Sequence, residues 1–383
     1  MDFEFTSEQK LLRETARNFA DREIIPAARE NDALERFPRD LIKKMAPLGF
    51  LGATVPERYG GAGLDNISGA IIFEEVGRGC SSLRTIISVQ VSLVEHAILK
   101  WGTDAQKEKY LPKLCSGELL GCFGLTEPGA GSDPSGMKTT AFRKGDGWRI
   151  NGSKTWISTG GLADLAVIFA RTEPSGHRGI SAFLVEKATP GFSSRDITGK
   201  LGLRAANTAE LFFEDCLVPG ENLIGSPGDG LKIALDALDS GRYGVAAGCV
   251  GIMRGCVDAS VKYSRERFQF GRQIASFQLV QDMIARMYVD MDAARLLVYR
   301  AGRLKDAGVR NTLETSVAKY FASEAAVRAA TDAIQIHGGY GYSNEYPVER
   351  YLRDAKVATI YEGTSQIQKL IIGENVVGVR AFV

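Results

Sequence analysis

The hydrophobic pattern of this 383-residue chain changes twice, and the two changes divide it into three parts. Up to about residue 120, apolar residues recur at helical spacing. From Cys122 to Phe213 the apolar runs are short and separated by turn residues, a pattern typical of strands. The helical period returns at Leu231. We therefore predict an α+β fold that is mostly α, with a helical domain over 1–120, a β domain over 121–227 and a helical bundle over 228–383.

Local signals predict where the helices begin and end. Thr6-Ser7-Glu8-Gln9 matches a capping box, with Thr6 as N-cap and Gln9 three residues later. Pro26 should kink or divide the helix that follows. The strand-like runs predict a compact antiparallel β domain. Further helices are predicted near 39–48, 68–77, 84–101, 104–115, 231–265, 275–307, 312–337, 346–356 and 365–379.

Charge and composition argue against several classes of partner. Lys and Arg number 47 against 46 Asp and Glu, which disfavours nucleic acid or an anionic membrane as the main partner. No run approaches roughly 18 uninterrupted apolar residues, so membrane insertion is not expected. The N-terminus, Met1-Asp2-Phe3-Glu4, is acidic and lacks the basic start of a signal peptide. Six cysteines without a CxxC pair predict reduced thiols in a cytoplasmic protein, and three histidines without a cluster predict no metal.

Two glycine-rich stretches resemble nucleotide-binding motifs but depart from them. Gly129-Ala130-Gly131-Ser132-Asp133-Pro134 has Pro134 where GxGxxG needs its third glycine. In the stretch from Gly147 to Thr155, Ser153 stands between Gly152 and Lys154, so a P-loop is not formed. Because this stretch lies between predicted strands, we expect a hairpin there.

The segment Ile360-Tyr361-Glu362-Gly363-Thr364-Ser365-Gln366 offers two interpretations. Glu362 is a potential general base if apolar surroundings raise its pKa towards neutrality. It is equally a potential solvated residue at a helix start, with Thr364 or Ser365 as N-cap.

Five motifs in order along the chain are more informative than any one of them. They are Phe123 to Asp133, Gly152 to Ser158, Arg267 to Gly271, Gln335 to Gly339, and Tyr361 to Gln366. With these motifs the sequence resembles the acyl-CoA dehydrogenase family over essentially its whole length. The resemblance implies an enzyme that binds FAD and an acyl-CoA thioester between a helical domain, a β domain and a C-terminal four-helix domain.

The resemblance also implies which residues hold FAD. Leu125 and Thr126 would meet the pyrimidine edge of the flavin, Trp156 its face, and Ser158 the region of N5, where the family more often has Thr. Core packing of Trp156 is the alternative. Arg267, Gln269 and Phe270 would reach the pyrophosphate in a neighbouring subunit. The full set of implied FAD contacts is Leu125, Thr126, Ser132, Trp156, Ser158, Arg267, Gln269, Phe270, Gln278, Gln335, Gly339, Thr364 and Gln366.

For the substrate, the resemblance implies that Glu362 removes the α-proton while the β-hydrogen leaves as hydride to flavin N5. The Glu362 N–H would polarise the thioester carbonyl. Some relatives carry the base on the long helix after the β domain, where this chain has Gly241, and this favours Glu362. Asp239 and Arg242 are alternatively an exposed i,i+3 pair on a helix. The implied substrate contacts are Ser132, Asp239, Arg242, Tyr361, Gly363, Arg84 and Ser88.

The acyl group is left open by the sequence. Thr364 to Gln368 resembles short- and medium-chain enzymes, which predicts a short acyl-CoA. Arg84 and Ser88 resemble residues that meet the distal carboxylate in glutaryl-CoA dehydrogenases, so a glutaryl- or alkylsuccinyl-CoA is the alternative. Gly77 replaces an acidic residue of those enzymes, and Arg84 could instead reach solvent.

Further implications concern partners and turnover. The resemblance implies a homotetramer, electron-transferring flavoprotein as electron acceptor, and a role in fatty acid or organic acid degradation. A flavin-binding scaffold without turnover is the alternative from another class, and intact Glu362, Ser158, Thr126 and Arg242 argue against it.

Overall fold

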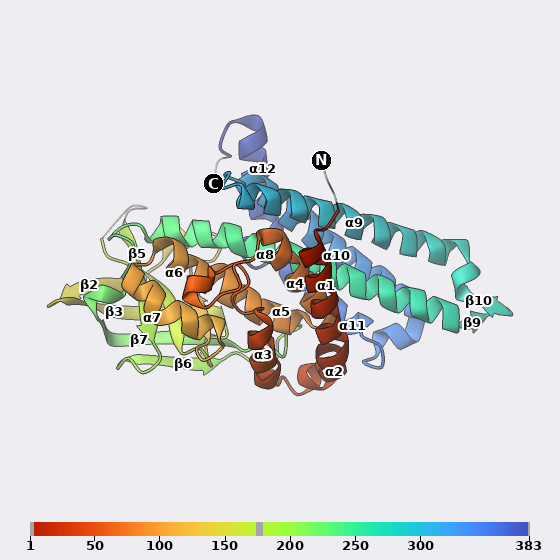
Figure 1. Cartoon of the computed structure of the whole chain (residues 1–383), viewed down its shortest axis with the longest axis horizontal. Coiled ribbons are helices and arrows are strands. Elements are labelled where there is room, and N and C mark those ends of the chain that lie inside the picture. The colour runs from red at the N-terminus through yellow and green to blue at the C-terminus, as the bar shows by residue number, and fades with distance from the viewer. Residues whose placement is uncertain (1–3, 174–178, 382–383) are drawn as a thin grey trace.

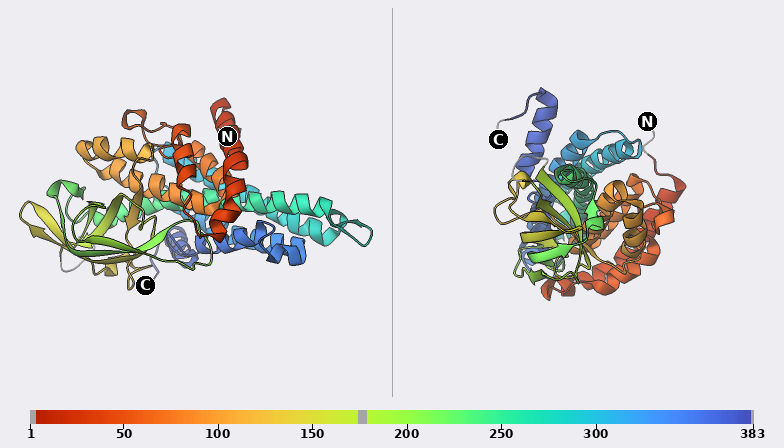
Figure 2. Two further views of the ribbon diagram at one scale, coloured as in Figure 1. Left: turned by 90° about the horizontal axis from the view of Figure 1, so that it is seen from below. Right: turned by 90° about the vertical axis from the view of Figure 1, so that its left-hand side faces the viewer.

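The computed structural model describes residues 4–173 and 179–381, so Met1 to Phe3 of the acidic N-terminal segment lie outside the described residues. The molecule is elongated, with the large sheet at one end of its long axis and the short β9–β10 hairpin at the other (Figures 1 and 2). Helices occupy the space between, and α12 projects from the body.

The first part of the chain is helical, as predicted. Its helices are α1 (Ser7–Phe19), η1 (Ala20–Ile24), α2 (Ile25–Ala33), α3 (Arg39–Met45), η2 (Ala46–Leu48), η3 (Glu57–Tyr59), α4 (Asn66–Gly79), α5 (Ser81–Ser88), η4 (Val89–Glu95), α6 (His96–Trp101) and α7 (Asp104–Cys115). The capping box is confirmed, because Thr6 Oγ1 accepts from the Gln9 N–H and Gln9 Oε1 accepts from the Thr6 N–H. Pro26 stands in the first turn of α2, just after the π-helical turn η1 that divides the long helix.

The central part is a mixed sheet rather than the antiparallel one predicted. Its strands are β1 (Gly121–Gly124), β2 (Thr140–Lys144), β3 (Gly147–Ser158), β4 (Leu165–Arg171), β5 (Ile180–Glu186), β6 (Phe192–Asp196), β7 (Thr208–Val218) and β8 (Leu223–Ile224). The order is β6-β7-β3-β2-β4-β5-β8, and β1 pairs with β4 in parallel. The prediction failed here because strand runs reveal spacing and not the direction in which a distant strand returns.

The expected hairpin also lies elsewhere. Gly152 to Thr155 belongs to the interior of β3, and the turn between β2 and β3 is at Gly145 and Asp146. Gly152 adopts a φ of 142°, and the β3–β7 register shifts beside it, so the glycine serves a β-bulge.

Strand β4 explains why the β domain sits firmly on the helices. Leu165, Val167 and Phe169 contact the core shared with η4, α6 and α7. The alternate residues Ala166, Ile168 and Ala170 belong to the interior of the β domain. Because successive side chains of a strand point to opposite faces, this one strand contributes to two cores.

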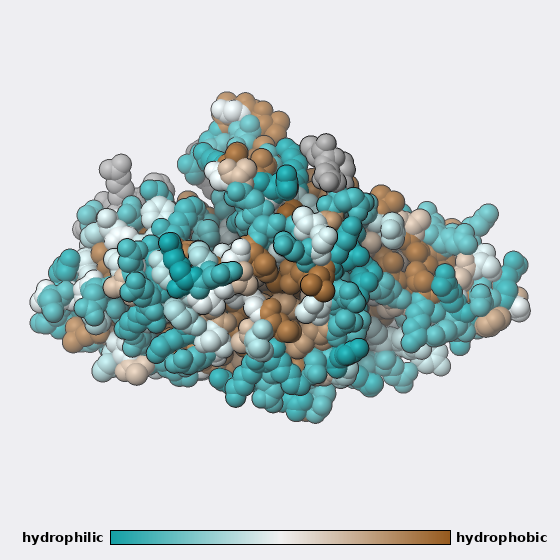
Figure 3. Space-filling view, viewed as in Figure 1, coloured by the Kyte–Doolittle hydropathy of each residue, from teal (hydrophilic) through white to brown (hydrophobic). Residues whose placement is uncertain are grey.

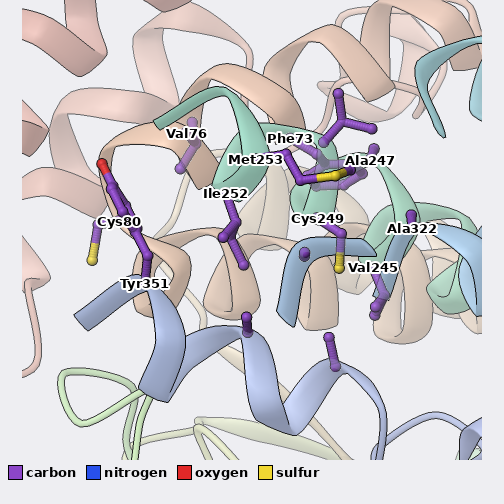
Figure 4. Close-up of a cluster of buried hydrophobic side chains, with 14 of the residues drawn as sticks. Phe73, Val76, Cys80, Val245, Ala247, Cys249, Ile252, Met253, Ala322 and Tyr351 are labelled. Carbon is purple, nitrogen blue, oxygen red and sulfur yellow. The ribbon is translucent and has the colours of Figure 1, made fainter. Parts of the chain in front are cut away.

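The third part is a bundle built around one long helix. Its elements are α8 (Gly230–Glu266), β9 (Phe268–Gln269), β10 (Arg272–Gln273), η8 (Ile274–Ser276), α9 (Gln278–Asp306), α10 (Thr312–His337), η9 (Gly338–Tyr342), α11 (Val348–Ala358) and α12 (Ser365–Val377). Figure 4 shows α8 side chains such as Cys249, Ile252 and Met253 among Phe73 and Tyr351 from other helices.

Helix α8 has the length and composition to cross a membrane, and among the described residues no other helix does. Its most apolar window is 78% buried inside the protein, as in a core helix of this kind. All six cysteines are free and buried. Among the residues that the structure covers, no group of three or more His, Cys, Asp or Glu side chains could hold a metal ion.

Candidate active site

A cleft of about 1110 Å³ lies where the β domain meets α8 and the loop before α12. Half of the predicted site residues, from distant parts of the chain, meet in it. Those lining it are Leu125, Thr126, Ser132, Trp156, Ser158, Asp239, Arg242, Tyr361, Glu362 and Gly363.

Glu362 lies in a tight loop between α11 and α12. Thr364 is the N-cap of α12, and its hydroxyl accepts from the Ile367 N–H at 3.2 Å. The backbone φ of Glu362 is 52° and that of Gly363 is 89°. A non-glycine residue in the left-handed region is strained, so surrounding contacts must hold the loop in this shape.

Three buried side chains supply those contacts by donating to the two carbonyls of the loop. Arg242 Nε donates to the Glu362 carbonyl at 3.0 Å, and Lys319 Nζ donates to the Gly363 carbonyl at 2.7 Å. Gln368 Nε2 also donates to the Gly363 carbonyl, at 3.0 Å. Arg242 is further bonded to Asp239 at 2.8 Å and is itself only 4% exposed. The alternative of an exposed surface pair is therefore wrong for Arg242.

The Glu362 carboxyl is poised to exchange a proton near neutral pH. Its Oε2 is removed from solvent and has no hydrogen-bond partner among the described residues. Burial raises the pKa of Glu362 to about 7, although Arg84, Lys319 and Arg242 act in the opposite direction. The alternative of a solvated helix-start residue does not describe this carboxyl.

Gly241 gives the Glu362 carboxyl its space. A Cβ atom at position 241 would lie 2.8 Å from both Glu362 Cδ and Leu93 Cδ2 and would overlap Glu362 Oε2. A side chain on α8 at this point and the carboxyl of Glu362 therefore compete for the same volume.

Arg84 is buried beside this loop and does not reach solvent, so that alternative is wrong. It is 2% exposed, and its Nη2 donates to the Tyr361 hydroxyl at 2.5 Å. Arg84 Nε and Ser88 Oγ are buried without a hydrogen-bond partner among the described residues. Tyr361 lines the cleft whereas Arg84 and Ser88 do not, so Arg84 contacts the site through Tyr361.

The β-domain wall of the cleft presents an aromatic face. Trp156 is 62% exposed with a φ of 60°, and the β3–β7 register shifts between Lys154 and Ile157. This bulge turns the indole out of the sheet, so Trp156 is not a core residue. Ser158 lines the same cleft, and the Thr155 N–H donates to the Thr126 carbonyl at 3.0 Å. A broad aromatic wall next to hydroxyl and backbone groups fits a planar heteroaromatic cofactor.

A buried ion pair supports that wall from behind. Lys154 Nζ lies 2.8 Å from Glu127 Oε1 and also donates to the Leu125 carbonyl. Glu127 accepts from the Lys138 and Thr139 N–H groups, at 2.6 and 3.0 Å. The pair therefore ties β3 to the Leu125–Glu127 segment.

Replacing Lys154 by Met should lower the free energy of unfolding by about 3 kcal/mol, because it leaves a buried carboxylate without its cation. Chemical unfolding followed by circular dichroism would measure this loss. Lys109→Met is the matched control, since Lys109 pairs with Glu186 at 2.8 Å on the surface. That variant should change stability by less than about 1 kcal/mol. Equal losses in the two variants would contradict the structural role of the buried pair.

The remaining predicted cofactor residues lie elsewhere in the chain. Arg267, Gln269 and Gly339 line a second cavity, of about 650 Å³, beside the β9–β10 hairpin at the far end of the molecule (Figure 1). Phe270, at the tip of that hairpin, is 90% exposed. Gln278, Gln335 and Gln366 are exposed. One copy of the chain thus does not bring these residues to the first cleft.

Sequence reasoning missed several residues of the site. Lys319 lies in no motif, and Gln368 entered only as the end of the Thr364–Gln368 segment. Their contacts with the Glu362 loop follow from the packing of α10 and α12 against that loop. The one sequence signal for a special role of Lys319 was its position beside the alanines of one helical face, Ala318, Ala322 and Ala326.

Family models match almost the whole chain. The N-terminal domain of acyl-CoA dehydrogenase matches residues 6–118, the middle domain residues 122–216 and the C-terminal domain residues 228–377.

Similar proteins extend over the same length. A short-chain specific acyl-CoA dehydrogenase of Clostridium acetobutylicum is 47% identical, covering 98% of this chain and 100% of the relative. A glutaryl-CoA dehydrogenase of Desulfococcus multivorans is 45% identical, covering 99% of each.

Three solved structures share the fold closely. Butyryl-CoA dehydrogenase of Megasphaera elsdenii has a TM-score of 0.96 at 41% identity, covering 98% of this chain and 100% of the other. A Mycobacterium smegmatis glutaryl-CoA dehydrogenase in complex with FADH2 has a TM-score of 0.95 at 34% identity, covering 99% of this chain and 97% of the other. A chain of the structure described as the electron transferring flavoprotein of Acidaminococcus fermentans has a TM-score of 0.97 at 46% identity, covering 98% of this chain and 99% of the other. This chain therefore belongs to the acyl-CoA dehydrogenase family.

Proposed function

We propose that this protein oxidises an acyl-CoA thioester to the trans-2-enoyl-CoA, with Glu362 as the base that removes the α-proton. The observation that carries the proposal is the buried carboxyl of Glu362, which lines the cleft, has an unpartnered Oε2 and has its pKa raised to about 7. A general base works best when its pKa lies near the working pH. The reaction proposed is therefore one that begins with proton abstraction beside a carbonyl.

FAD is the cofactor of this family, and a structural neighbour is a complex with FADH2. When bound, FAD supplies the acceptor for the substrate's β-hydrogen, which leaves as hydride. The exposed face of Trp156 would support the flavin ring, and Ser158 would donate a hydrogen bond near its centre. Leu125 and Thr126 would meet the pyrimidine edge through backbone groups and the Thr126 hydroxyl.

The shape of the Glu362 loop supports a second task for its backbone. Among the described residues the Glu362 N–H donates to no protein group, while its carbonyl accepts from Arg242 Nε. An N–H that faces a thioester carbonyl stabilises the negative charge that develops there as the α-proton leaves. Glu362 would then supply both the base and an oxyanion donor.

The proposed substrate is a short acyl-CoA, because a short-chain specific relative is 47% identical over the full chain. Ser132, Asp239 and Arg242 would contact the CoA portion, and Tyr361 and Gly363 would border the thioester. Anaerobic titration with a panel of acyl-CoA thioesters tests the proposal: bleaching of the flavin absorbance is expected with butyryl-CoA. If no member of the panel bleaches the flavin, the alternative of a binding scaffold holds instead.

A dicarboxylyl-CoA, such as glutaryl- or an alkylsuccinyl-CoA, is the second candidate. The observation in its favour is the buried guanidinium of Arg84, which has no carboxylate bonded to it among the described residues. Ser88 Oγ is likewise unpartnered. A buried cation without an anion is costly, and a distal carboxylate that displaces the Tyr361 hydroxyl would offset that cost.

Arg84→Met should separate the two candidates by its effect on two substrates. If Arg84 binds a distal carboxylate, kcat/KM for glutaryl-CoA should fall about 100-fold or more, because a charged hydrogen bond in a buried site is lost. Turnover of butyryl-CoA is the internal control and should change far less. A wild-type enzyme that neither binds glutaryl-CoA nor is reduced by it would exclude the second candidate.

The proposed partners and assembly follow from the placement of the remaining cofactor residues. The second cavity with Arg267, Gln269 and Gly339 supports a site shared between subunits, and hence a homotetramer. Exposed apolar residues on α9 and at the outer end of α12, including Leu279, Val289 and Val376, support such contacts. Figure 3 shows hydrophobic surface at the outer end of the projecting part of the molecule. We further propose a cytoplasmic enzyme of fatty acid or organic acid degradation that passes electrons to electron-transferring flavoprotein. Sedimentation analysis would test the assembly.

A further inference from the structure

Lys319 is a buried cation in contact with the loop that carries the proposed base. It lies on α10, its side chain is fully buried, and its Nζ donates to the Gly363 carbonyl at 2.7 Å. A lysine is almost never fully buried unless it is paired. No carboxylate lies within ion-pair distance of Lys319 among the described residues, so its closest acceptor is this carbonyl.

The loop needs such a donor because of its backbone conformation. Glu362 and Gly363 are consecutive residues with positive φ, and the carbonyls of both point to buried donors instead of continuing a helix. Helix α12 begins only at Ser365. Removing a donor would leave a buried carbonyl with fewer partners and would release the strained conformation.

Charged groups approach Glu362 from several helices. Arg84 comes from α5, Arg242 from α8 and Lys319 from α10, and Tyr361 is next to it in the loop. Cys249 of α8 and Glu324 of α10 in turn lie near Lys319. Arg242 and Arg84 are each bonded to a side chain, Asp239 and Tyr361 respectively. Lys319 bonds only to the loop backbone among the described residues.

We propose that Lys319 is a positioning residue, which holds the Glu362–Gly363 loop in its strained shape and provides a positive charge beside the Glu362 carboxyl. The inference rests on the proposed function, in which Glu362 is the base. Through the loop carbonyl Lys319 fixes where the carboxyl and the Glu362 N–H point. Its charge opposes the effect of burial and so increases the ionised fraction of the Glu362 carboxyl near neutral pH.

The test is the pH dependence of kcat/KM in FAD-loaded Lys319→Met. A neighbouring cation lowers a carboxyl pKa by about one pH unit or more. The acidic limb of the profile should therefore move from about pH 7 in wild type to higher pH by about one unit. Flavin reduction at pH 7 should fall about fivefold from this cause alone. Lys319→Arg retains a positive charge and should restore the position of the acidic limb, even if its rate is lower.

Lys305→Met is the matched control. Lys305 is a half-buried lysine of α9 whose pKa burial lowers to about 8, as burial does for Lys319, but it bonds to Ser240 Oγ at 3.2 Å. Its replacement should affect stability without moving the acidic limb. An unchanged limb in Lys319→Met, or equal shifts in both variants, would overturn the proposal. If wild type is reduced by no acyl-CoA, the proposed function fails instead, which is a distinguishable result.

Discussion

Glu362→Gln should retain FAD and acyl-CoA but lose flavin reduction by substrate about 10³- to 10⁴-fold, the upper range for a general base. Gln fills the same volume and preserves the backbone N–H, so binding and the oxyanion contact should persist. What is lost is the acceptor of the α-proton. Anaerobic stopped-flow measurement of flavin bleaching gives the rate, and the absorbance of the purified variant gives its FAD content.

The control for this variant is Glu95→Gln. Glu95 is a wholly buried carboxyl whose two oxygens, like Oε2 of Glu362, have no hydrogen-bond partner among the described residues, but it does not line the cleft. Its replacement should leave flavin reduction near the wild-type rate. Rapid flavin reduction in Glu362→Gln would remove Glu362 from the role of base.

The pH profile follows from the same carboxyl. Because the pKa of Glu362 is raised to about 7 and the base must be deprotonated, wild-type kcat/KM should rise with pH through about 7 and then level off. A carboxyl at its ordinary pKa would place this rise near pH 4 to 5, about two to three units lower.

The second large effect is a relocation of the base. Glu362→Gly should lose activity to the same extent as Glu362→Gln, and adding Gly241→Glu should recover about 10- to 100-fold of it, if general-base catalysis is restored in part. The geometry supports this because a Cβ at position 241 would lie 2.8 Å from Glu362 Cδ. Glycine at position 362 accepts the φ of 52° more readily than Glu does.

The double variant Gly241→Gln/Glu362→Gly is the control for this experiment. It fills the same space without a base and should remain as inactive as Glu362→Gly. If Gly241→Glu/Glu362→Gly is no more active than this control, a carboxyl at position 241 cannot reach the α-proton that Glu362 is proposed to remove. Thermal unfolding of each variant would show whether the helix α8 tolerates the added side chain.

Particular residues show how far sequence reasoning reached. Periodicity predicted the helices on either side of the β domain, because helix signals are local. The Thr6 cap was confirmed, and of the two candidate caps Thr364 and Ser365 the structure has Thr364. The prediction that all strands are antiparallel was wrong. The parallel pairing of β1 with β4 joins Gly121 to Leu165, more than forty positions later in the chain, and local patterns do not reveal such a distant pairing. The prediction of a hairpin at Gly152 was wrong, because glycine occurs both in β-bulges and in tight turns and here it belongs to a bulge.

By itself the sequence determined the order of helical and strand segments and the motifs of the family, and through the family resemblance it pointed to Glu362 as the proposed base. These are properties of local spacing and of residue type. Only the tertiary structure decided that Oε2 of Glu362 is removed from solvent, that Gly241 leaves room for the carboxyl and that Lys319 and Arg242 hold its loop. The physical reason is that a pKa and a strained φ depend on groups brought together from α5, α8 and α10, which no local pattern encodes.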